Sequence, residues 1–353
     1  MASRLILLFC SVVAALFALE IGCRAVRGRY LLIHWPNLVL EIRESSARFN
    51  RTTMSEDPEL GYTPRIGFTP HGSEIGPVGK HDAQGMRLMP PLENVAKRPL
   101  ILATGDSYTY GAEVSEAETW PAYLQGLLRV NVANGGVIAY GLDQIVLRSE
   151  RLARELRPDA MVLSFIADDL RRNELSRYVG FEKPYFVREG SKLVLQHVPM
   201  PPPPSPWQTL SFWERSLGWS VLLQTVLLRL DWPEDWPYDS VRVQPRGAGA
   251  DVACLLMRRV AALSIPTLVV AQYDDVWLSI PGSMPEHRRL SAAVLRCAKE
   301  AGLETLDTFD AISAARGRDP VNNLFAPEGH LNAIGNQVIA ETIAATLRRL
   351  DLP

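Results

Sequence analysis

The sequence predicts an α/β fold of three layers, in which helices cover both faces of a five-stranded parallel sheet. From residue 98 onward, short apolar runs alternate with longer segments whose apolar residues recur at helical spacing. The run at residues 160–166 is apolar almost throughout, which is typical of a strand buried on both faces. Because strands and helices alternate, the strands are expected to be parallel and joined by right-handed crossovers.

The expected elements follow from these patterns. Residues 142–156 show the helical stripe most clearly, with Leu142, Ile145, Val146 and Leu152 on one face. The expected strands are residues 100–104, 130–133, 160–166, 267–272 and 303–306. The expected helices are residues 120–128, 142–156, 251–263, 286–301 and 333–350.

Two segments depart from this alternation. Residues 30–97 are rich in proline and glycine after an amphipathic start, and we expect a connecting N-terminal extension there. The domain proper is expected at 98–353, with an insertion at about 170–248 that includes the proline tract 199–206. Long excursions from a compact scaffold are usually functional or disordered, so the insertion is interpreted as a lid or substrate-shaping element. A family insertion without substrate contact is the alternative.

The N-terminus carries an apolar stretch. Residues 5–19 contain no charge, and residues 21–23 can lengthen the stretch toward the roughly 20 residues that a spanning helix needs. A signal peptide is the alternative, but no A-x-A cleavage site ends the run. We therefore expect residues 1–29 to be an uncleaved single-pass membrane anchor with its flank. Arginines after the span outnumber those before it, which does not fit an N-terminus inside the cell.

Charge and cysteine content narrow the function classes. The net charge is −2, from 37 basic and 39 acidic residues, so no broad positive field favours nucleic acid. The four cysteines have neither metal-site nor redox-motif spacing. Cys254 and Cys297 fall in apolar helical patterns and are expected to be buried thiols. A disulfide between them remains open if the compartment is oxidising.

A serine follows the first predicted strand, in the segment 105–111. Ser107 is expected at the start of a helix, where its N–H points outward with the positive helix end behind it. Such a position suits a nucleophile whose attack creates an oxyanion. A simple capping role is the alternative for Ser107, and Asp106 beside it is expected to hold the turn.

A histidine precedes the last predicted helix. His330 is a candidate general base for Ser107, and Glu328 is a candidate to orient its imidazole. Ligands in such folds bind at the carboxyl ends of the strands, so loops 134–141 and 167–170 belong to the same region. A metal hydrolase built on Asp168, Asp169 and His330 is the weaker alternative, because it lacks ligands.

Taken together, these segments resemble the motif blocks of the SGNH/GDSL hydrolase superfamily. The Gly-Asp-Ser block matches residues 105–111, and the second block matches residues 134–141 with Ala139 in place of the oxyanion glycine. In the third block, Asp168 occupies the position of the usual oxyanion Asn. In the last block, Glu328-x-His330 resembles the Asp-x-His variant of members that modify bacterial surface polysaccharides.

The resemblance implies a flavodoxin-like sheet over about residues 98–350 and a Ser107–His330–Glu328 triad. It also implies an oxyanion hole made by Ser107, Ala139 and Asp168, with no cofactor and no metal. An ionised Asp168 cannot donate a hydrogen bond, and one lost donor costs about 2.7–4 kcal/mol of transition-state stabilisation. Asp168 is therefore expected to be protonated by burial, to point elsewhere, or to make the enzyme slow.

The expected activity is two-step acyl transfer from an ester to water. The resemblance implies an acyl or acetyl esterase of a bacterial membrane-anchored type, facing the periplasm and acting on an acylated cell-envelope glycan or lipid. An O-acyltransferase that passes the acyl group to a sugar hydroxyl is one alternative. A non-catalytic acyl-glycan-binding member is the other, favoured by Asp168. The expected partners are an ester-bearing small molecule or glycan and the membrane.

Overall fold

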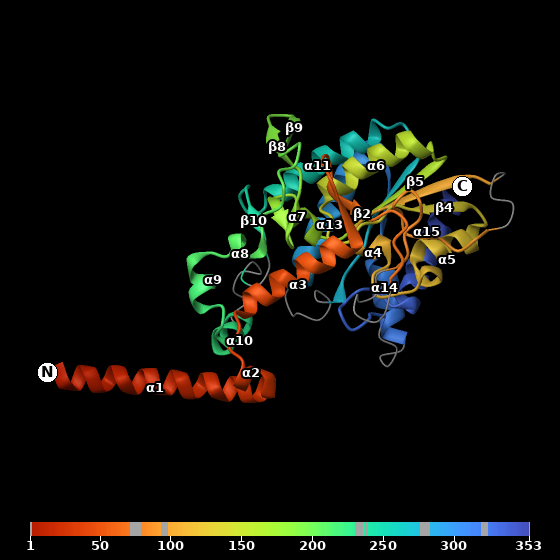
Figure 1. Ribbon diagram of the computed structural model, residues 1–353. Helices are drawn as coiled ribbons and strands as arrows, with labels where there is room; N and C mark the ends of the chain where they lie inside the picture. The colour runs from red at the N-terminus through yellow and green to blue at the C-terminus, as the bar shows by residue number, and fades with distance from the viewer. Residues whose placement is uncertain are drawn as a thin grey trace.

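A five-stranded parallel sheet forms the centre of the molecule in the computed structural model (Figure 1). The structure describes residues 2–70, 79–92, 98–229, 236, 239–275, 283–318 and 324–352. The strand order is β12-β11-β5-β3-β4, and every pairing is parallel. The bounds are β3 Leu100–Thr104, β4 Asn131–Asn134, β5 Ala160–Phe165, β11 Thr267–Ala271 and β12 Glu304–Asp307. The predicted fold class is confirmed.

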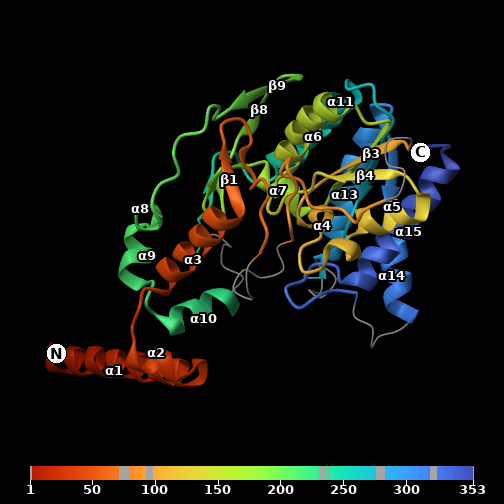
Figure 2. The same ribbon diagram turned by 45° about the vertical axis from the view of Figure 1, so that its right-hand side comes forward.

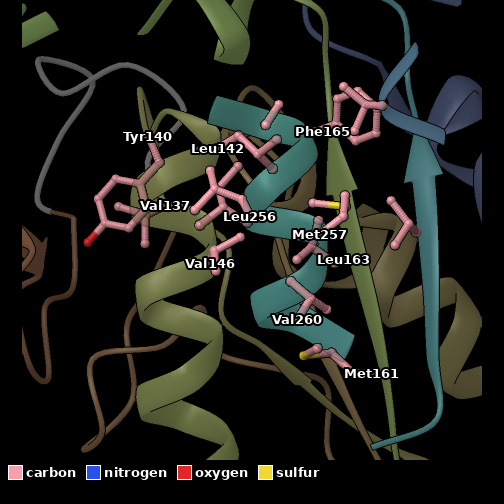
Figure 3. Packing of buried hydrophobic residues seen from close by; sticks show 14 of the residues in the cluster. Val137, Tyr140, Leu142, Val146, Met161, Leu163, Phe165, Leu256, Met257 and Val260 are labelled. Atoms are coloured by element: carbon pink, nitrogen blue, oxygen red, sulfur yellow. The ribbon is translucent and has the colours of Figure 1, made fainter. Parts of the chain in front are cut away.

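Helices cover both faces of the sheet, because alternate strand residues point to opposite sides. Met161, Leu163 and Phe165 of β5 belong to one hydrophobic cluster, together with residues of α6 (Leu142–Leu156), α11 (Ala248–Ala261) and α13 (Met284–Glu300) (Figure 3). Ala160 and Val162 belong to a second cluster with α5 (Trp120–Leu128), α14 (Phe309–Arg318) and α15 (Ala333–Arg349). All six residues of β5 are buried, as the apolar run predicted.

The five predicted helices that cover the sheet agree closely with the structure, and α14 is added to them. Helices α5 and α6 have the predicted bounds, and α11 begins three residues before the predicted start. Helix α14 was not predicted, because its sequence has a weak apolar stripe. Its packing comes from tertiary contact of Ile312 with the second cluster.

The N-terminal extension packs on the sheet domain instead of only connecting it to the anchor. It contains α2 (Arg29–Ile33), α3 (Leu38–Thr53), β1 (Met54–Asp57) and β2 (Gly61–Pro64). Asn37 caps α3 by accepting a hydrogen bond from the Leu40 N–H. The Tyr62 hydroxyl donates to the carbonyl of Ile138, and the Tyr140 hydroxyl donates to the carbonyl of Tyr62. The extension thereby supports the loop that follows β4.

The insertion has two parts. The first contains α7 (Asp168–Arg172), a small sheet of β6 (Leu175–Tyr178), β7 (Phe181–Glu182) and β10 (Val241–Arg242), and a hairpin of β8 (Tyr185–Glu189) and β9 (Lys192–Gln196). The second contains α8 (Pro206–Thr209), α9 (Phe212–Leu217) and α10 (Val221–Arg229). These three helices lie beside α1 (Ala2–Arg27) and α3, away from the sheet (Figure 2). The interpretation of the insertion as a lid or substrate-shaping element stays a prediction.

Helix α1 (Ala2–Arg27) extends away from the body (Figure 1). Its segment Ser3–Arg27 is long and apolar enough to cross a membrane, and almost none of it is buried against the protein. A signal sequence near an N-terminus has the same properties.

Cys254 of α11 and Cys297 of α13 form a disulfide, with their Cα atoms 5.1 Å apart. The expectation of two buried thiols is therefore wrong. Cys297 packs against the first hydrophobic cluster, as the apolar pattern indicated. Only the packing of α11 against α13 brings the two sulfur atoms together.

We expect replacement of both Cys254 and Cys297 by Ser to lower the free energy of unfolding by about 2–4 kcal/mol, because the bridge closes a long loop in the unfolded chain. Urea unfolding of the full-length protein in detergent measures the change. The matched control replaces the free cysteines Cys10 and Cys23 and should leave stability unchanged. Equal stability of both double variants would contradict the bridge.

Candidate active site

Ser107 begins a one-turn helix shortly after strand β3, which lies between β5 and β4 in the sheet. Helix α4 (Ser107–Tyr110) is capped by Asp106, whose Oδ1 accepts the Tyr108 N–H at 2.9 Å. A Cβ atom at Gly105 would lie 2.0 Å from the Thr109 hydroxyl oxygen, so this turn requires glycine. The local sequence alone therefore presents Ser107 at the carboxyl end of the sheet.

His330 lies next to Ser107, although 223 positions separate them in the chain. The Nε2 atom of His330 is 3.0 Å from Oγ of Ser107. The loop that carries His330 is held by a bridge between Phe325 and Leu331, both buried. The Tyr108 hydroxyl donates to the carbonyl of Gly329 at 2.8 Å and fixes the loop against α4. The structure thus brings together the two residues that the sequence analysis paired.

The carboxylate that orients His330 belongs to Glu113. Its Oε2 lies 2.9 Å from Nδ1 of His330 and also accepts the His330 backbone N–H at 3.1 Å. Its Oε1 accepts the Glu328 backbone N–H at 2.9 Å. Glu328 itself is exposed and contributes only that N–H. The structure therefore contradicts the expected place of Glu328 and puts Glu113 there.

A strained backbone brings Glu113 to this position. Glu113 has φ of +66°, a left-handed conformation that is uncommon for a residue with a side chain. Gly111, two residues earlier, also has a positive φ and ends α4. Such strain is typical of functional sites. Sequence reasoning missed Glu113 because nothing in the spacing of the first motif block marks an acid there. Only the fold of the loop after Gly111 does so.

The loop after β4 lies against α4. A Cβ atom at Gly136 would be 2.3 Å from the backbone nitrogen of Tyr110, so only glycine permits this contact. Ala139 in the same loop has φ of +65°, a left-handed conformation that glycine adopts more readily than a residue with a side chain. Within the described residues, the backbone N–H groups of Ser107 and Ala139 donate to no protein acceptor. Neither N–H is therefore occupied by an acceptor in the described part of the chain.

Asp168 is held in ion pairs. Its carboxylate lies 2.7 Å from Nε of Arg171 and 2.7 Å from Nη2 of Arg172. Burial alone would raise the pKa of Asp168, but Arg172 and Arg171 hold that pKa far below its ordinary value. The carboxylate is ionised and cannot donate. Asp168 therefore does not meet the expected role of an oxyanion donor. The sequence also left open that burial protonates Asp168, and that expectation is wrong.

Arg172 links three loops at this edge of the sheet. It is buried and reaches Asp169 at 2.8 Å, Asp106 at 3.9 Å and the carbonyl of Tyr140 at 2.9 Å. Burial raises the pKa of both Asp106 and Asp169, while Arg172 opposes the rise. Sequence reasoning missed Arg172. The spacing of Asp168 and Asp169 from it, four and three positions along a helix, could have indicated the pairing.

A metal site receives no support from the described part of the chain, where no group of three His, Cys, Asp or Glu side chains could hold an ion. Asp168 and Asp169 instead use their carboxylates on arginine.

Comparison with known proteins gives a likeness of fold. No family model and no curated protein matches the chain. A lipolytic protein of the G-D-S-L family from Desulfitobacterium hafniense is 14% identical, with TM-score 0.38, covering 70% of this chain and 99% of its own. LAE5, an alpha/beta hydrolase from the Lake Arreo metagenome, is 15% identical, with TM-score 0.45 and coverages of 71% and 96%. A mutant of the acetylxylan esterase Axe2 from Geobacillus stearothermophilus is 14% identical, with TM-score 0.42 and coverages of 72% and 95%.

Replacement of Asp168 by Asn should lower the free energy of unfolding at pH 7 by about 2 kcal/mol, because Arg171 and Arg172 lose a charged partner. The folded-state pKa of Asp168 is depressed, so its contribution is present above the ordinary value of about 3.9 and is lost as pH falls below it. The difference between wild type and variant should therefore shrink below about pH 4. Urea unfolding at several pH values measures it.

The control for this variant is Asp251→Asn, which removes an exposed carboxylate 3.8 Å from Arg188. An exposed pair contributes well under about 1 kcal/mol, so this change should be nearly neutral. Equal losses in the two variants at pH 7 would show that the Asp168 ion pairs add nothing specific.

Proposed function

We propose that this protein is a serine-dependent ester hydrolase. The observation that carries the proposal is the hydrogen-bonded chain from Ser107 Oγ through the His330 ring to the Glu113 carboxylate. A hydroxyl, an imidazole and a carboxylate in this order are the parts of nucleophilic acyl transfer. The available N–H groups of Ser107 and Ala139 provide the charge stabilisation that the reaction needs.

In the first step, Ser107 Oγ attacks the ester carbonyl carbon while His330 Nε2 takes the hydroxyl proton. The carbonyl oxygen becomes an oxyanion near the N–H groups of Ser107 and Ala139. When the tetrahedral intermediate collapses, the carbon–oxygen bond to the alcohol breaks and His330 returns the proton to the alcohol. In the second step water attacks the acyl-serine, again through His330, and releases the acid.

Glu113 has two tasks in this scheme. It fixes the His330 tautomer by accepting from Nδ1, which leaves Nε2 free to take the serine proton. Its charge stabilises the imidazolium that forms during attack. The Glu113 side chain is 7% exposed, and this limits screening of the charge by water.

The substrate class that we propose is an acylated glycan or lipid of the cell envelope, with the domain outside the cytoplasm. Helix α1 supports a membrane location, because it is long and apolar enough to span a bilayer. The Cys254–Cys297 disulfide supports an oxidising compartment, because such bonds rarely persist in a reducing cytosol. Transfer of the acyl group to a sugar hydroxyl would use the same first step.

Replacement of Ser107 by Ala should lower turnover of a short acyl ester by about 10⁴-fold or more, because no nucleophile remains. Hydrolysis of p-nitrophenyl acetate by the full-length protein measures the loss. The wild type should react covalently with a fluorophosphonate at Ser107, and the variant should not. A wild type that neither turns over the ester nor reacts with the probe would favour the non-catalytic binding member.

Replacement of Glu113 by Gln should lower kcat by about 10²–10⁴-fold, because an amide cannot stabilise the imidazolium and can select the wrong tautomer. Glu328→Gln is the matched control and should keep kcat near the wild-type value, because only the backbone of Glu328 contacts Glu113. The pH profile of kcat for each variant distinguishes loss of the orienting charge from loss of folding. A large loss of kcat in Glu328→Gln with no loss in Glu113→Gln would contradict the role of Glu113 and favour the Ser107–His330–Glu328 triad expected from the sequence.

A further inference from the structure

Three exposed aromatic side chains lie on the second part of the insertion. Trp207 of α8 is 53% exposed, and Phe212 and Trp213 of α9 are 71% and 63% exposed. We call these three residues the aromatic edge. Phe212 and Trp213 contact each other edge to face, with ring centroids 5.2 Å apart. Large apolar side chains gathered on one surface indicate a place where the protein meets something other than water.

Helix α10, which follows the aromatic edge in the chain, is fixed to the end of α1. Glu20 of α1 accepts the backbone N–H groups of Val221 and Leu222, at the start of α10, at 3.0 and 2.9 Å. It also accepts the Ser220 hydroxyl at 2.8 Å. Glu20 therefore caps a helix 200 positions away in the chain. Figures 1 and 2 show α10 beside the C-terminal end of α1, with α8 and α9 next to it.

Arg24 completes this attachment. It donates to Glu20 at 2.6 Å and to the carbonyl of Trp219 at 2.5 Å, and it is fully buried. Its guanidinium lies 3.7 Å from the centroid of the Trp35 ring, which also stacks on Phe17 of α1. Tryptophans gathered at one end of an apolar helix are typical of the membrane–water interface.

Within the described residues, the exposed charged side chains of α1, α2, α8, α9 and α10 are all positive, whereas the neighbouring α3 also carries exposed Glu41 and Glu44. The acidic residues of α1, α2, α8, α9 and α10 are Glu20 and Glu214, and both are buried in ion pairs, with Arg24 and Arg43. The exposed charged residues of these helices are Arg4, Arg27, Arg29, Arg215 and Arg229. Arginines beside an apolar span are complementary to anionic lipid headgroups.

We propose that the aromatic edge enters the headgroup region of the anionic phospholipid bilayer that α1 crosses. This inference depends on α1 being a membrane span and not on the catalytic proposal. The insertion is then a second membrane contact of the chain. Because Glu20 and Arg24 fix α10 to α1, the two contacts together hold the domain at one orientation to the membrane.

The test measures depth in the bilayer with a nitroxide label. In the full-length protein, Cys10→Ser and Cys23→Ser remove the free thiols, and Trp213→Cys carries the label. The labelled protein is placed in nanodiscs of phosphatidylcholine and phosphatidylglycerol. Collision with oxygen, which concentrates in lipid, is compared with collision with a water-soluble nickel chelate. The label at position 213 should favour oxygen several-fold over a control label at Glu341→Cys, an exposed position on α15.

Other outcomes would overturn the proposal. An oxygen-to-nickel ratio at position 213 equal to that at position 341 would place the aromatic edge in water. Low access to both reagents would indicate a contact with protein. A label at Val12→Cys tests separately whether α1 spans the bilayer. A lipid signal at position 12 together with a water signal at position 213 would confirm the span and contradict the membrane contact of the aromatic edge. Phe212→Cys repeats the measurement on the neighbouring side chain.

The lipid charge is tested in the same samples. In phosphatidylcholine alone, the exposed arginines lose their anionic partners, and the ratio at position 213 should fall while the ratio at position 12 stays the same. An unchanged ratio at position 213 would show that the contact does not depend on anionic lipid.

Discussion

The guanidinium of Arg172 holds together the edge of the sheet where the candidate chemistry lies. It contacts Asp106 after β3, the carbonyl of Tyr140 after β4, and Asp168 and Asp169 after β5. Three loops that are separate in the chain thus share one buried cation. Removal of one partner from a buried charged group is strongly destabilising, so these loops are constrained as a set. Ser107 and Ala139 keep their relative places for this reason.

Glu113 attaches a fourth loop, the one that carries His330, to the same edge of the sheet. One carboxylate binds the His330 ring, the His330 N–H and the Glu328 N–H, so the loop before α15 is attached to the loop after α4. This carboxylate is therefore hydrogen-bonded to three donors on the loop before α15. Its left-handed backbone is the conformational cost of this arrangement. The proposed orienting acid therefore lies in the loop that follows Ser107 in the chain, and not in the loop that carries His330.

A buried ion pair also fixes the end of α1 to the insertion. Glu20 and Arg24 lie in a helix that is otherwise apolar, and both satisfy their hydrogen bonds on the insertion and on the chain after α1. Charged groups in such a helix are costly unless paired. This ion pair explains why Glu20 and Arg24 stand near the end of the apolar stretch. The sequence alone indicates only that these two residues lie at the boundary of a short span.

The sequence by itself determined the parallel sheet, its five strands, most of its helices and the places of Ser107 and His330. These depend on short-range patterns: apolar periodicity, glycine turns and a serine directly after a strand. Tertiary structure decided that Glu113 replaces Glu328 and that Cys254 meets Cys297. Each of these is a contact between side chains on different elements, and periodicity records which face a residue occupies but not which residue lies opposite it.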